Sequence, residues 1–122
     1  MEFFRIIDKQ VTEELIKDSI QPKSIENYTE TMLFIENHEE NFIGSTLWGE
    51  FKISYDKING GVRFTLLDCP NALSWTITTG LSEVGKMIVL HCTINQSNKP
   101  DEFIEEIQEF LDEWETGIKA TF

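Results

Sequence analysis

Residues 47–66 read LWGEFKISYDKINGGVRFTL, two runs of alternating apolar and polar side chains joined by a glycine-containing turn. A period of two is typical of a β-strand that has one buried and one solvated face. The pair Asn59 and Gly60 favours a tight turn, because both residues tolerate positive φ angles. We therefore predict a β-hairpin, whose two apolar rows are Leu47, Phe51, Ile53 and Tyr55 on the first strand and Val62, Phe64 and Leu66 on the second.

Three further segments extend the predicted sheet. Residues 73–78 alternate in the same way, with Leu73, Trp75 and Ile77 on one face. Residues 87–94 are apolar on both faces, which indicates a strand in the centre of the sheet or beneath helices. Residues 24–37 fit either a helix or a strand, and we favour a strand over residues 29–36 because the side chains alternate there.

The chain is predicted to end in an amphipathic helix, which Pro100 begins and Gly117 ends. One stripe at the 3.6-residue period holds its apolar side chains, which are Phe103, Ile104, Ile107, Phe110, Leu111 and Trp114. A shorter helix is expected over residues 9–20, and Pro22 follows its end. Together these elements predict a single α+β domain spanning residues 1–122. Its antiparallel sheet has four or five strands, with the C-terminal helix packed on one face and the shorter N-terminal helix beside it.

The charge of the chain narrows the class of partner. The 22 acidic residues exceed the ten basic ones and give a formal net charge of −12. This argues against binding nucleic acid or anionic membranes, since both need Lys and Arg. It favours either a basic partner protein, whose encounter the field would steer, or plain solubility. We expect no signal peptide and no membrane span, and therefore a cytoplasmic protein with reduced cysteines.

The terminal helix concentrates this charge. It carries eight carboxylates, and no Lys or Arg lies between Lys99 and Lys119. Helix faces usually alternate signs, because oppositely charged pairs four residues apart stabilise a helix by about 0.2–0.5 kcal/mol each. We therefore expect a binding surface for a basic partner on this helix, formed by Glu102, Glu105, Glu106, Glu109, Asp112 and Glu113. Trp48 is either an exposed aromatic anchor of that surface or a covered residue of the sheet, and both readings stay open.

Motifs for catalysis and for metal binding are weak. His91 and Cys92 are neighbours on a predicted strand, so their side chains point to opposite faces. Glu102, Glu105, Glu106 and Glu109 have the spacing of di-iron helical bundles, but the chain has no Glu-x-x-His sequence. The chain also has no phosphate-binding loop, dinucleotide glycine motif or Cys-x-x-Cys pair. We expect no catalytic residue, no metal and no cofactor, and hence a protein that is not an enzyme.

In size, acidity and lack of motifs the chain resembles small bacterial immunity proteins, although no sequence motif carries the likeness. The resemblance implies an inhibitor that neutralises a basic toxin such as a nuclease, by imitating the charge of nucleic acid. Two alternatives remain. Residues 103–114 are similar to the C-terminal amphipathic helix of small acidic secretion chaperones, which would act as dimers. A small hydrolase or ligand-binding domain would instead need a pocket that holds His91, Cys69 or paired carboxylates.

Overall fold

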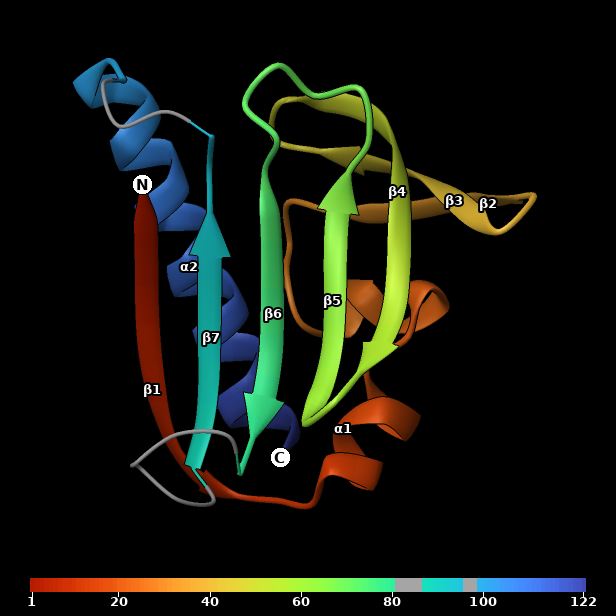
Figure 1. The fold of residues 1–122 in the computed structure, drawn as a ribbon, viewed down its shortest axis with the longest axis vertical. Helices are drawn as coiled ribbons and strands as arrows, with labels where there is room; N and C mark the ends of the chain where they lie inside the picture. Colours follow the sequence, from red (N-terminus) through yellow and green to blue (C-terminus); the bar gives the residue numbers. More distant parts are fainter. Residues whose placement is uncertain (81–86, 96–98) are drawn as a thin grey trace.

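The computed structural model of the chain describes residues 1–80, 87–95 and 99–122. Two α-helices, one 3₁₀-helix and seven strands lie in these residues (Figure 1). In chain order they are β1 (Glu2–Gln10), α1 (Glu13–Ser19), η1 (Pro22–Asn27), β2 (Leu33–His38), β3 (Asn41–Thr46), β4 (Gly49–Ile58), β5 (Gly61–Leu66), β6 (Ser74–Thr79), β7 (Met87–Thr93) and α2 (Asp101–Thr121).

The strands form one antiparallel sheet in the order β1-β7-β6-β5-β4-β3-β2. Helix α2 crosses one face of this sheet, and Figure 1 views the molecule with the strands in front of it. Helices α1 and η1 complete the covered side next to β4, where the Tyr55 hydroxyl donates a hydrogen bond to the Ile20 carbonyl at 2.6 Å. Among the described residues, no helix is both long and apolar enough to cross a membrane.

The core lies between α2 and the sheet, and it confirms the predicted alternation within β4 and β5. The prediction is wrong for Leu47, which is exposed in the turn before β4 because the strand begins only at Gly49. The side chains of Ile53, Val62, Phe64 and Leu66 in the β4–β5 hairpin are all buried. The two tryptophans of the core pack against each other and against this hairpin: Trp75 and Trp114 have ring centroids 6.0 Å apart. The predicted strand over residues 73–78 corresponds to β6, and the strand over residues 87–94 corresponds to β7, which lies between β1 and β6.

The predicted strand count of four or five is wrong, because the described chain forms seven strands. Strand β1 was missed because it lies at an edge, where Phe4 and Ile6 face solvent and hide the alternation. Its last residues were assigned to the following helix, which begins only after Thr12 caps the Leu15 N–H with its hydroxyl. Of the ambiguous residues 24–37, residues 24–27 belong to η1 and residues 33–37 to β2, so the strand predicted over residues 29–36 begins only at Leu33. Strand β2 forms a hairpin with the missed strand β3.

The predicted end of the terminal helix at Gly117 is also wrong, because α2 continues to Thr121. Gly117 has a different role, since an added Cβ would lie 2.0 Å from the carbonyl oxygen of Tyr28. The glycine thus lets the helix backbone approach the segment that follows η1. A C-cap signal and a close-approach signal look the same in sequence, because both require only that the residue has no side chain.

Candidate protein-binding surface

The rotation of α2 about its axis is fixed by its buried side chains. Five of them, at the helical period, are almost fully buried against the sheet: Ile107, Phe110, Leu111, Trp114 and Ile118. The opposite side therefore faces solvent. Glu102, Glu105, Glu109 and Asp112 are exposed there, while Glu106 and Glu113 are partly buried at the flank.

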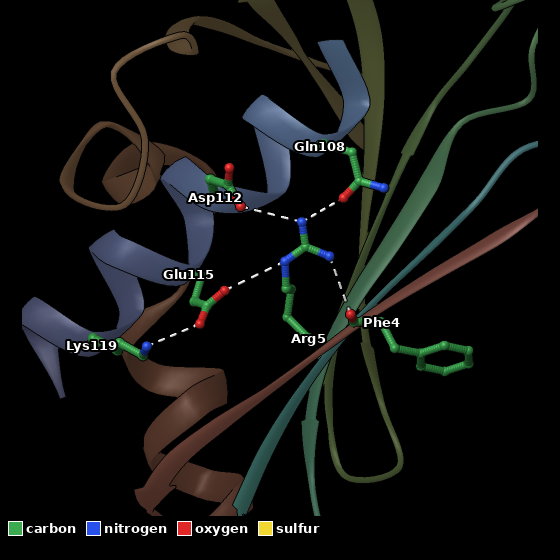
Figure 2. A network of polar contacts seen from close by, with 6 residues as sticks. All are labelled: Phe4, Arg5, Gln108, Asp112, Glu115 and Lys119. Atoms are coloured by element: carbon green, nitrogen blue, oxygen red, sulfur yellow. Dashed lines mark hydrogen bonds and ion pairs between the residues drawn. The ribbon is translucent and has the colours of Figure 1, made fainter. Parts of the chain in front are cut away.

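Asp112 belongs to a polar network that joins α2 to the edge strand β1. The Arg5 guanidinium lies 3.2 Å from an Asp112 carboxylate oxygen and 3.5 Å from one of Glu115 (Figure 2). It also donates a hydrogen bond to Gln108, and Lys119 pairs with Glu115 at 2.9 Å. Arg5 thus neutralises the β1 side of the helix surface, and Asp112 has a structural role in addition to any binding role.

Glu113 holds the other side of the helix. Its carboxylate accepts a hydrogen bond from the backbone N–H of Glu30 at 3.1 Å, which fixes the segment between η1 and β2. A cleft of about 390 Å³ lies between that segment and α2. We call it the acidic cleft, because four carboxylates are among its lining residues, which are Glu26, Asn27, Tyr28, Glu30, Asp112, Glu113, Thr116 and Gly117.

The remaining four predicted residues form what we call the acidic face: Glu102, Glu105, Glu106 and Glu109. Within the described part of the chain, none of these four carboxylates has a hydrogen bond or an ion pair. Their spacing of three, four and seven residues places them on one side of the helix, as the sequence predicted. Six of the seven predicted residues therefore lie together on one surface of α2.

Trp48 does not extend this surface as an exposed anchor. It lies in the turn between β3 and β4, so the strand alternation used to place it on the solvent side does not apply. Its ring packs against Phe103 and Phe110 of α2, with centroids 5.9 and 5.4 Å away. The alternative reading, in which Trp48 is covered, is therefore the one that the structure supports.

His91 and Cys92 lie on opposite faces of the sheet, as their neighbouring positions on one strand predicted. His91 lies on the uncovered face of the sheet, where its ring stacks on Phe4 and its Nε2 lies 3.0 Å from Glu2. Cys92 points to the opposite face, where burial raises the pKa of its thiol to about 12. In the described residues, no group of three or more His, Cys, Asp or Glu side chains is arranged to hold a metal ion.

Sequence reasoning missed Glu26 and Glu30, which contribute to the acidic cleft. Both lie far from α2 in sequence, and their proximity depends on the Tyr28 contact with Gly117, for which the sequence holds no pairwise signal. Comparison with known proteins adds no relatives: no protein-family model, curated protein or solved structure matches the chain.

Proposed function

We propose that this domain is a non-enzymatic, cytoplasmic inhibitor that binds a basic partner protein through the acidic face and the acidic cleft. A toxin that cleaves nucleic acid is the partner class that we favour. Such an enzyme holds phosphates in a basic cleft, so an acidic protein that covers this cleft would compete with the substrate. The observation that carries the proposal is the acidic face, four carboxylates without a basic partner in the described chain.

The arrangement of charge supports a steered encounter. Glu102, Glu105, Glu106 and Glu109 extend along the first half of α2, and the cleft continues the negative surface along the second half. Extended fields of one sign raise association rates by about 10- to 1000-fold at low salt. On the acidic face, lysine or arginine side chains of the partner would meet carboxylates that have no hydrogen bond or ion pair within the described residues.

The proposal is tested by replacing Glu105, Glu106 and Glu109 with Gln together. This removes three charges but keeps the size of each side chain. With the domain as bait in a lysate of the source organism, we expect one basic protein to be retained at low salt and released at high salt. The triple variant should associate with that protein about tenfold more slowly at low salt, and the difference should shrink as salt is added.

A matched control separates the acidic face from net charge. Replacing Glu36, Glu40 and Glu50 with Gln removes the same three charges from exposed positions on or near the β2–β4 strands. This control should keep most of the wild-type association rate. Equal slowing by both triple variants, or none by either, would sink the idea that the acidic face is the binding surface. Addition of the wild-type domain should also inhibit nucleic acid cleavage by the purified partner.

One observation favours the secretion-chaperone alternative. Large apolar side chains are exposed at both edges of the sheet, with Phe4 and Ile6 on β1 and Leu33 and Ile35 on β2. A chaperone would use such surfaces for its own dimer or for an unfolded client segment. Analytical ultracentrifugation discriminates the two functions, since a monomer at all concentrations opposes the chaperone and a tight dimer favours it.

A further inference from the structure

A second concave feature lies at the end of the molecule where α2 begins. The turn between β3 and β4, the loop between β5 and β6 and the start of α2 meet at this end of the sheet, at the top of Figure 1. Together they enclose a cavity of about 250 Å³. Its walls are mainly apolar and are formed by Trp48, Phe51, Leu66, Cys69, Pro70, Asn71, Leu73 and Phe103.

The size and chemistry of this cavity limit what can occupy it. Sites for cofactors and drug-sized ligands usually measure about 300–1000 Å³. The cavity is slightly below that range, and suits a single leucine, methionine or phenylalanine side chain. Apolar pockets of this kind receive the anchor residues that supply much of the binding energy at protein interfaces.

The charged residues around the cavity indicate the charge of the partner segment whose apolar side chain would enter it. Phe103 forms one wall, and Glu106 lies three residues further along α2, next to Phe103 on the helix surface. Glu102 immediately precedes Phe103 and is exposed in the first turn of the helix. Asp68 is exposed beside Cys69. One cation, Lys99, lies 6.0 Å from the Phe103 ring and donates a hydrogen bond to Asn71, so the surroundings still carry a negative excess.

We propose that this cavity receives one apolar side chain of the basic partner, with lysine or arginine residues on either side of it contacting Glu102 and Glu106. This inference rests on the proposed function and names the anchor of the same partner. Trp48 then acts in binding as a wall of the pocket instead of as a protruding anchor. The acidic face steers the partner, and the pocket slows its release.

Model peptides test the anchor without knowledge of the partner. The probe is an amidated pentapeptide with a central leucine between two pairs of lysines, and the matched peptide has alanine at the centre. We expect the leucine peptide to bind about tenfold more tightly, since its side chain leaves water in the pocket. A third peptide, with serine in place of every lysine, should bind more weakly than the first.

The two cysteines allow the pocket to be blocked after folding. Cys69 is partly exposed in the pocket wall, whereas Cys92 is fully buried with a pKa raised by burial, so N-ethylmaleimide should modify Cys69 alone. The modified protein should lose its preference for leucine over alanine and keep its salt-dependent affinity for lysine. Cys69→Ser is the control: treatment with N-ethylmaleimide should leave its affinities for the three peptides at the values measured before treatment.

The outcomes of these experiments distinguish the proposed role of the pocket from that of the acidic face. Equal affinity for the leucine and alanine peptides, or a leucine preference that survives modification of Cys69, overturns the pocket. Equal affinity for the lysine and serine peptides would contradict the proposal that basic residues flank the apolar side chain that enters the pocket. If leucine preference is absent while lysine-dependent binding is lost in the Glu105, Glu106 and Glu109 triple variant, the pocket fails and the proposed function stands.

Discussion

Replacing Gly117 by alanine tests how closely α2 is packed against the rest of the domain. In the interior of an isolated helix, alanine is more favourable than glycine by about 1 kcal/mol. In this protein the new Cβ would lie 2.0 Å from the carbonyl oxygen of Tyr28 and 2.5 Å from its Cα, whereas ordinary contact begins at 3.4 Å. Helix propensity and packing therefore predict opposite signs for the same substitution.

The Tyr28 backbone has little room to move away. Its ring is buried and stacks on Trp114 and Phe122, with centroids 5.8 and 6.2 Å apart. Its hydroxyl donates a hydrogen bond to the Ser19 carbonyl at 3.1 Å. Relief of the clash must separate α2 from this segment and weaken those contacts, and such overpacking costs about 1–3 kcal/mol or more.

Because the new Cβ would lie 2.0 Å from a backbone atom, we take the upper end of that cost, about 3 kcal/mol, and subtract the gain of about 1 kcal/mol in helix propensity. We therefore expect the Gly117→Ala variant to be less stable than the wild type by roughly 2 kcal/mol. Urea denaturation followed by circular dichroism measures this difference. Thr116→Ala is the matched control, because Thr116 is the exposed neighbour and should gain a few tenths of a kcal/mol. A Gly117→Ala variant as stable as the wild type would refute the close approach of the two backbones.

Two further predictions concern single polar contacts. Arg5→Ala should lower the free energy of unfolding by about 1 kcal/mol, because it removes the ion pairs to Asp112 and Glu115. Arg63→Ala should leave the free energy of unfolding almost unchanged, because its ion pair with Asp56 is exposed. Urea denaturation of both variants measures the two changes. Burial and the nearby negative charge of Asp18 raise the pKa of Tyr55 to about 12 in the folded protein. The neutral tyrosine therefore contributes to the free energy of unfolding in full below pH 10, and this contribution is lost as the pH rises through 12. Tyr55→Phe should flatten that decline in denaturation curves measured between pH 9 and pH 12, and an unchanged decline would contradict the assignment.

The parts of the fold that the sequence predicted are those with local signals. The β4–β5 hairpin has alternation on both strands and an Asn-Gly turn between them, and its register pairs Ile58 with Gly61. Helix α2 has a long apolar stripe, so its existence and its buried face were both predictable. Strand β1 has neither signal, because Phe4 and Ile6 are exposed and Arg5 turns inward to meet α2.

For the candidate surface, the positions of residues on the helix could be predicted from the sequence, whereas their contacts with distant segments could not. Helical spacing alone places the acidic carboxylates on the solvent side of α2, and the structure confirms that placement for Glu102, Glu105 and Glu109. The sequence did not reveal that Arg5 would pair with Asp112 from a strand that is distant in the chain. It also misplaced Trp48, because the turn at that position interrupts the strand alternation.

Some of the acidic side chains of α2 have a partner within the domain, so their charge is explained without a binding role. Asp112 and Glu115 pair with Arg5, and Glu113 caps the Glu30 backbone, so these three have structural roles. The helix was predicted to end at Gly117, but it extends to Thr121, so these three residues lie further from its negative end than predicted. Asp101 and Glu102 are in the first turn, where the helix dipole favours acids.

Glu105, Glu106 and Glu109 remain in the middle of α2, with neither a basic partner in the described chain nor help from the dipole. Like charges three and four residues apart destabilise a helix by a few tenths of a kcal/mol per pair. Their replacement by Gln should therefore stabilise the domain slightly while it slows association with the partner. A stabilised variant whose association rate is unchanged would mean that these three residues provide solubility and not recognition.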